Sequence, residues 1–154
     1  MKAALLFVAG LAGCATPNPL VGAWVVDVAR THEEIQKIEP RLTATQRAIL
    51  AKPAFFGDMS YVFDREQVLV IVHGACTGPM PYRYERLAGT KVRIVFEDSE
   101  GDTEETEIDL TAREIITPVG GGLEKEGVGQ VFGLATYEAV ARKYACVGEA
   151  KMAL

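Results

Sequence analysis

Apolar and polar residues alternate along most of this chain, and that alternation constrains the fold more than any other feature. It is clearest over residues 91–97, where Val92, Ile94 and Phe96 alternate with neighbours that are mostly charged. A period of two places alternate side chains on opposite faces of a strand, so such a run suits a strand with one buried face. The chain is therefore predicted to be mainly β.

Eight runs of this kind are predicted, nearly all joined by short polar turns. They are residues 20–28, 59–64, 68–73, 82–85, 91–97, 105–110, 115–119 and 129 to about 140. A turn to helix near Glu138 is the alternative for the end of the last run. A meander of antiparallel strands loses its unpaired edges when it closes on itself. We therefore expect an eight-stranded antiparallel up-and-down barrel, whose interior is filled by side chains or holds one small ligand.

The connection between the first two runs is long and has helical signals. Thr31 with Glu34, and Thr43 with Gln46, have the spacing of a capping box, in which two side chains satisfy the first N–H groups of a helix. A proline follows each stretch and ends it. Two short helices are expected between about residues 31 and 53, with Thr31 as the N-cap of the first.

The first fourteen residues have the pattern of a secretory signal. Lys2 supplies a positive charge, residues 3–12 are apolar, and Gly13 and Cys14 follow. About ten apolar residues are too few to span a ~30 Å hydrocarbon core. Residues 11–14, with the sequence Leu-Ala-Gly-Cys, resemble the bacterial lipobox. The resemblance implies cleavage before Cys14 and acylation of that cysteine.

Three segments are expected from this signal: a signal peptide at 1–13, a lipidated tether at 14–19 and a barrel domain at 20–154. Several acyl chains hold a protein on a membrane without a spanning helix. The tether is short and contains two prolines, which predicts a domain close to the bilayer. Because Ala15 and not aspartate follows Cys14, we expect the outer membrane, with the domain facing the periplasm.

Cys76 and Cys146 are left as a pair once Cys14 is acylated. In an oxidising compartment an even pair predicts a disulfide. Two free thiols remain the alternative, because spacing in the sequence does not fix the distance between the Cα atoms. His73 is the histidine nearest a cysteine, and one such pair is too few ligands for zinc, so no metal site is predicted.

Gly22 and Trp24 stand near the start of the first run, with one residue between them. This pattern resembles the Gly-x-Trp signature of the lipocalin superfamily, in which the tryptophan packs across the closed end of an eight-stranded barrel. The resemblance implies a lid over the open mouth, formed by the long connection, and a disulfide from a middle strand to the C-terminal tail. Other lipocalin features are not seen: there is no Thr-Asp-Tyr, the nearest candidate for the basal arginine is Arg142, and no amphipathic helix is predicted after the last run.

Large apolar side chains on alternating faces are candidates for the lining of a ligand cavity. They are Trp24, Tyr61, Phe63, Tyr82, Tyr84, Ile94 and Phe96. Residues of this kind are also ordinary core, so a hollow and a filled barrel both stay open.

Several classes of function are disfavoured. The formal net charge of −5 is not the basic footprint of a nucleic-acid-binding protein. The acidic run at 97–105 lacks EF-hand spacing and is typical of a solvated hairpin tip. No catalytic constellation or cofactor motif is found, so we expect neither an enzyme nor a cofactor.

The sequence thus predicts a membrane-anchored lipoprotein whose lipocalin-like barrel binds a small apolar ligand, such as a fatty acid or a lipid fragment. The alternative is a filled barrel that acts as a structural or interaction protein of the cell envelope, for example an assembly factor or an inhibitor of a periplasmic enzyme. The membrane, contacted through acyl chains, is the partner that the sequence predicts, and it indicates no protein partner.

Overall fold

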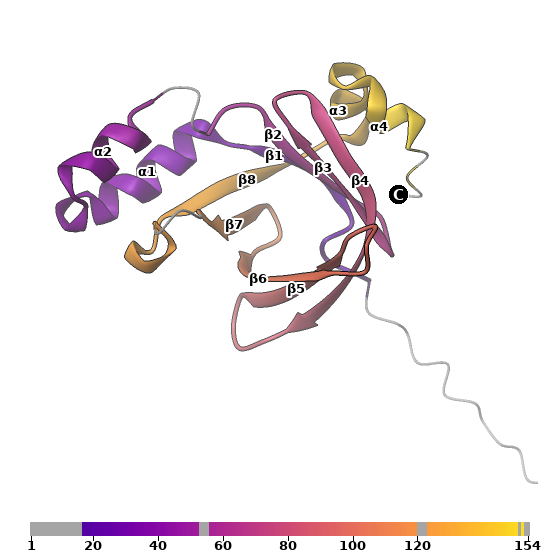
Figure 1. The fold of residues 1–154 in the computed structure, drawn as a ribbon, viewed down its shortest axis with the longest axis horizontal. Coiled ribbons are helices and arrows are strands. Elements are labelled where there is room, and N and C mark those ends of the chain that lie inside the picture. Colours follow the sequence, from indigo (N-terminus) through magenta and orange to yellow (C-terminus); the bar gives the residue numbers. More distant parts are fainter. Residues whose placement is uncertain (1–16, 53–55, 120–122, 151, 153–154) are drawn as a thin grey trace, which may run out of the picture.

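Eight antiparallel strands close into one barrel in the computed structural model, with β8 hydrogen-bonded back to β1 (Figure 1). The structure describes residues 17–52, 56–119, 123–150 and 152. The strands are β1 (Gly22–Val26), β2 (Met59–Phe63), β3 (Gln67–Val72), β4 (Ala75–Arg86), β5 (Lys91–Glu97), β6 (Thr103–Leu110), β7 (Glu114–Pro118) and β8 (Gly129–Ala135). The predicted up-and-down barrel is confirmed.

The two ends of the barrel differ. The chain enters β1 at one end, which we call the base, and the turns β2–β3, β4–β5 and β6–β7 lie at the same end. The opposite end, which we call the mouth, carries the long β1–β2 connection, the turns β3–β4 and β5–β6, and the β7–β8 loop. Each strand therefore runs from one end to the other. The position of a residue along the barrel axis decides which side chains it contacts.

The interior is packed from the base upward. Trp24 is 2 % exposed, and its indole N–H donates to the carbonyl of Leu20 at 2.8 Å. The buried residues around it form one cluster: Leu20, Trp24, Phe63, Val68, Tyr82, Val92, Ile94, Ile108, Ile115 and Phe132. Burying a large apolar side chain contributes about 1.5–3 kcal/mol, so this cluster is the main core of the barrel.

The first described residues are fixed to the base by a chain of hydrogen bonds. The Asn18 amide donates to the hydroxyl of Tyr82 at 2.7 Å, and that hydroxyl donates to the backbone carbonyl of Asp64 at 2.7 Å. Burial raises the pKa of Tyr82 to about 12, so its hydroxyl stays protonated and remains a donor. The segment before β1 is therefore held on the base of the barrel.

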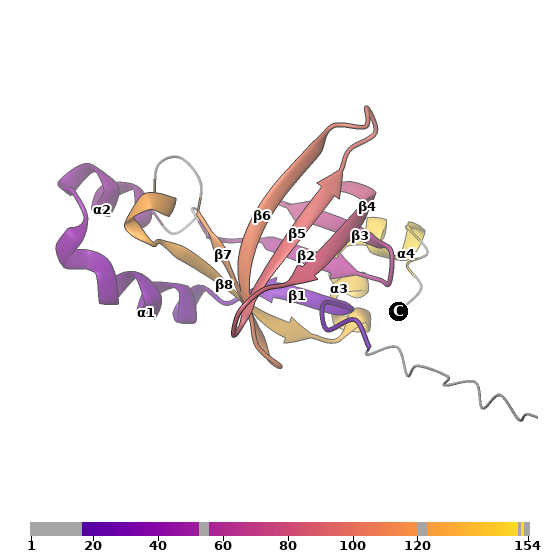
Figure 2. The same cartoon turned by 90° about the horizontal axis from the view of Figure 1, so that it is seen from below.

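Helices α1 (Val28–Ile38) and α2 (Ala44–Leu50), joined by the 3-10 turn η1 (Glu39–Arg41), form the β1–β2 connection. The two helices expected there are confirmed, and Thr43 and Gln46 form the predicted capping box. In Figures 1 and 2 both helices project to the side of the barrel. Their apolar residues pack with the β7–β8 loop, which includes the short 3-10 helix η2 (Glu124–Glu126).

The predicted start of α1 is wrong, because the helix begins one turn earlier. Its N-cap is Asp27, whose carboxylate accepts from the N–H of Arg30 at 2.9 Å. Thr31 is fully buried inside the helix, and its hydroxyl accepts from the N–H of Val131 at 3.0 Å. The Thr31 hydroxyl thus provides a hydrogen-bond partner for a backbone N–H of β8 at a point where β1 has already ended. The capping-box spacing does not indicate this contact.

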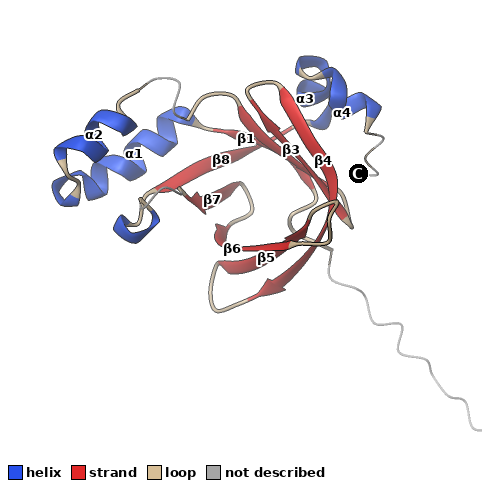
Figure 3. Ribbon diagram, viewed as in Figure 1, coloured by secondary structure: helices blue, strands red, loops and turns tan. Residues whose placement is uncertain are grey.

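The chain after β8 corrects a second expectation. The last predicted run reached residue 140, but β8 ends at Ala135, and α3 (Tyr137–Lys143) and α4 (Ala145–Glu149) follow. Their buried residues pack on the outer face of β1, β2 and β3: Val140, Tyr144 and Val147 meet Ala23, Val62, Leu69 and Ile71. Figure 3 shows these helices on the side of the barrel opposite α1 and α2.

A disulfide joins Cys76 in β4 to Cys146 in α4, with the Cα atoms 6.4 Å apart. The pairing predicted from the count of cysteines is therefore present. It links α4 to the mouth end of β4 across 70 residues of sequence. In the part of the chain that the structure describes, no helix has the length and apolar character needed to cross a membrane.

Candidate ligand cavity

A cavity of about 580 Å³ occupies the mouth half of the barrel. Its floor is apolar, and inward-facing side chains of five strands form it: Phe63, Val70, Ile94, Phe96, Ile108 and Ile115. Pockets that hold small molecules span roughly 300–1,000 Å³ and are mostly apolar. The barrel is therefore filled at the base and hollow toward the mouth.

Two polar side chains lie on the wall above this floor. Gln130, near the start of β8, is 9 % exposed and lines the cavity. Tyr61 in β2 also lines it, and its ring packs on Phe132 with 4.9 Å between centroids. Among the described residues, neither side chain forms a hydrogen bond. Both polar groups are consequently free to bind a ligand.

Tyr61 is held in its neutral form. Burial raises its pKa to about 12, and the negative charge of Glu104 acts in the same direction. At neutral pH the phenol is therefore protonated and offers both a donor and an acceptor.

Acidic side chains line the cavity where it opens. Asp98 and Asp102 lie in the β5–β6 turn, and Glu104 lies on the inward face of β6. The Asp98 carboxylate closes the turn by accepting from the N–H groups of Glu100 at 2.8 Å and Asp102 at 2.9 Å. The turn predicted from the acidic run is thus also the rim of the cavity.

The candidate lining residues divide by their height in the barrel. Phe63, Ile94 and Phe96 line the cavity. Trp24 and Tyr82 lie in the packed core at the base, and Tyr84 packs against that core without lining the cavity. Alternation in sequence identifies the inward face of a strand but carries no signal for depth, so it does not separate the two groups.

Gln130 is a polar lining residue that is absent from the candidates predicted from the sequence. It is polar, whereas the candidates are large apolar and aromatic residues. The available signal was its spacing of two from Phe132, which places both on the inward face of β8. A polar residue at an inward position of a barrel strand indicates a cavity or a buried hydrogen bond.

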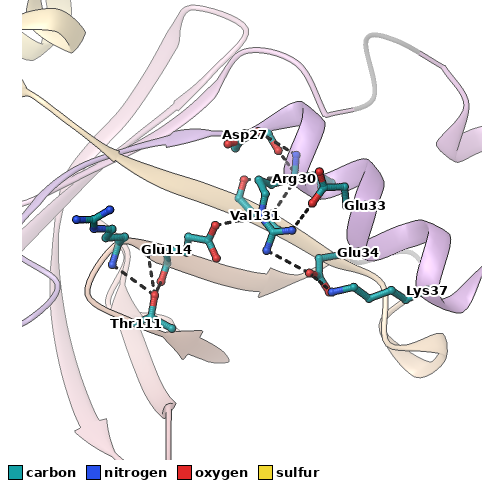
Figure 4. A network of polar contacts seen from close by, with 10 residues as sticks. Asp27, Arg30, Glu33, Glu34, Lys37, Thr111, Glu114 and Val131 are labelled. Atoms are coloured by element: carbon teal, nitrogen blue, oxygen red, sulfur yellow. Dashed lines mark hydrogen bonds and ion pairs between the residues drawn. The ribbon is translucent and has the colours of Figure 1, made fainter.

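Helices α1 and α2 do not form the lid implied by the lipocalin resemblance. Among the described residues, those that line the cavity include none from α1 or α2. Figure 4 shows how the start of α1 is tied to the outside of the barrel: the Arg30 guanidinium contacts Glu114 of β7 at 3.1 Å, and it also pairs with Glu33 and Glu34. Glu114, with the larger effect, and Glu33 raise the pKa of Arg30. The helices thus stand beside the mouth.

Arg142, the candidate for a basal arginine, is exposed on α3, where its Nε donates to the carbonyl of Glu138 at 3.3 Å. Cys14, with the signal and the first tether residues, lies outside the described residues. Within the described residues, no group of three or more His, Cys, Asp and Glu side chains is placed to hold a metal ion.

Comparisons of the chain with protein-family models, with curated proteins and with solved structures found no match. The function proposed below therefore rests on the cavity, its lining and the sequence signals.

Proposed function

We propose that this chain is a membrane-anchored lipoprotein whose barrel binds a small apolar ligand. The observation that carries the proposal is the cavity of about 580 Å³ with an apolar floor. Transfer of apolar surface out of water stabilises a complex by about 25 cal/mol per Å², and such a floor offers that surface. The protein binds its ligand and does not transform it.

The N-terminal sequence supports the anchored part of the proposal. A charged residue, a short apolar stretch and a lipobox-like Leu-Ala-Gly-Cys favour acylation of Cys14, with the domain on the periplasmic side of the outer membrane. The closed eight-stranded barrel with Trp24 across its base supports a distant relation to lipocalins. The alternative of a filled barrel is disfavoured, because the mouth half is hollow.

Ligand binding is tested by filling the cavity. Thr106→Trp places a large side chain on an inward wall position of β6, whereas Glu107→Trp places the same side chain on the adjacent outward position. We expect the first variant to lose binding of the neutral fluorescent dye N-phenyl-1-naphthylamine by at least about tenfold, because the indole occupies the ligand volume. Equal binding by both variants, with both shown to be folded by circular dichroism, would refute the cavity as the binding site.

Acylation is tested separately by the mass of the protein isolated from membranes. We expect the wild-type chain to lose residues 1–13 and gain acyl groups, and Cys14→Ala to retain the signal. Normal signal removal in Cys14→Ala would contradict the lipoprotein assignment without affecting the binding proposal.

A further inference from the structure

All charged residues that line the cavity are acidic. Among the described lining residues, Asp98, Asp102 and Glu104 carry negative charge, and none is lysine, arginine or histidine. On the neighbouring strand β5, Arg93 lies on the outer face and forms ion pairs with Glu85, Glu105 and Glu107. No cation in the described part of the wall therefore offsets the negative potential at the rim.

The position of Glu104 makes this charge relevant to a bound molecule. Glu104 and Tyr61 both line the cavity, and the negative charge of Glu104 adds to the effect of burial in raising the pKa of the phenol. No ion pair joins Glu104 to another described residue, whereas Glu105 and Glu107 on the outer face are both paired with Arg93. The inward carboxylate is thus available to a ligand.

Gln130 supplies an independent sign of a polar ligand group. Its side chain is nine-tenths buried in the wall and lacks a hydrogen-bond partner among the described residues. The amide lines the cavity and is accessible from it, so a ligand in the cavity can form hydrogen bonds with it. This amide both donates and accepts, and its oxygen can accept from an N–H group, as the carboxylates of the rim do.

From these features we propose that the ligand is an amphiphile with a cationic head, such as a long-chain amine. Its apolar body would lie on the floor of the cavity and its ammonium group beside the rim carboxylates, Glu104 among them, while the Gln130 amide offers a further acceptor on the wall. An anionic head would meet three carboxylates and no cation, which disfavours the fatty acid suggested by the sequence. This inference rests on the proposed binding function and adds the charge of the ligand to it.

The test compares ligands that share one tail and differ in the head: decylamine, decanol and decanoate. The full lipidated chain is held in phosphatidylcholine vesicles, and each ligand displaces N-phenyl-1-naphthylamine at neutral pH, with protein-free vesicles as background. We expect decylamine to displace the dye at a concentration at least about tenfold below that of decanoate, with decanol between them, because the rim carboxylates attract an ammonium head and repel a carboxylate head.

A matched pair of variants assigns the preference to the cavity. Glu104→Gln and Glu107→Gln change the net charge equally and lie on the same strand, but only the first residue faces the cavity. We expect Glu104→Gln to reduce the amine-to-decanoate preference about tenfold and Glu107→Gln to leave it unchanged. Equal effects of both variants, or equal or tighter binding of decanoate by the wild type, would overturn the inference. Failure of the dye and of all three ligands to bind would instead refute the proposed function.

Discussion

At the scale of single residues, the Gly-x-Trp pair at the base is explained by backbone geometry and packing. Gly22 has a φ of +147°, a conformation that side chains rarely adopt, and a Cβ atom there would lie 3.1 Å from Cδ1 of Leu134. Two residues later, Trp24 fills the base and donates to the carbonyl of Leu20. The glycine therefore lets the chain enter β1 beside Leu134 and close the barrel over the tryptophan.

Gly22→Ala is expected to lower the free energy of unfolding by about 1–3 kcal/mol, because the backbone is strained and Leu134 must shift. Urea denaturation followed by tryptophan fluorescence measures the change. Gly133→Ala is the matched control, since a Cβ at Gly133 meets no atom within 4 Å. The explanation fails if both substitutions have the same effect.

At the scale of elements, the alternation in sequence predicted all eight strands but not every helix boundary. Thr31 stands three residues before Glu34, which fits a capping box. Its hydroxyl instead accepts from the N–H of Val131 in β8, a long-range contact that a local sequence pattern does not indicate. Helices α3 and α4 have seven and five residues, too few for a clear helical stripe. Their apolar side chains face the outside of the barrel, and the sequence does not indicate that surface as a packing site.

Thr31→Val keeps the shape of the side chain and removes its hydroxyl. Because the N–H of Val131 would then be buried without its partner, we expect the free energy of unfolding to fall by about 1–3 kcal/mol. Chemical denaturation of the two proteins provides the measurement. Thr31→Ser retains the hydroxyl and should recover most of the loss, and a serine variant no more stable than the valine variant would argue against the hydrogen bond.

The attachment of α3 and α4 has a pH-dependent component. Lys143 and Tyr144 both donate to the carboxylate of Asp58, and these bonds, the Lys143 bond first, lower the pKa of Asp58 below its usual range. A lowered pKa in the folded state stabilises the protein above the pKa of the unfolded chain. The contribution is therefore present at neutral pH and is lost as the pH falls below about 4.

Asp58→Asn removes the charge and tolerates the positive φ of 60° at this position. Because the pair is partly exposed, we expect the variant to be less stable than the wild type by at most about 1 kcal/mol at neutral pH. The difference should vanish near pH 2, and urea denaturation at the two pH values measures it. A difference that is the same at both values would exclude an electrostatic origin.

At the scale of the whole molecule, the sequence predicted a closed barrel but not the distribution of space within it. Phe63, Ile94 and Phe96 surround a cavity, whereas Trp24 and Tyr82, chosen by the same alternation, are packed core. The difference depends on how far along the barrel axis strand pairing places each residue, and on the N-terminal segment that covers the base. Both are tertiary features. The disulfide was predictable because only two cysteines remain after Cys14 is assigned to acylation.

Replacing both Cys76 and Cys146 by serine is expected to reduce the free energy of unfolding by about 4 kcal/mol, because the bond closes a loop across 70 residues of the unfolded chain. Thermal and urea denaturation of the double variant measure the loss, and the reduced wild-type protein should behave in the same way. If neither reduction nor substitution changes the stability, α4 is held by its apolar contacts alone.

The attachment of the N-terminal segment to the base has a consequence for how cargo enters. Asn18 holds the chain at one end of the barrel, and the cavity opens at the other, roughly 20 Å away for strands of about six to seven residues. A barrel anchored through that segment would direct its opening toward water and away from the acyl layer. Cargo would then arrive as dissolved single molecules, so the rate of loading would follow aqueous solubility, and short-chain amphiphiles would load faster than long-chain ones of equal affinity.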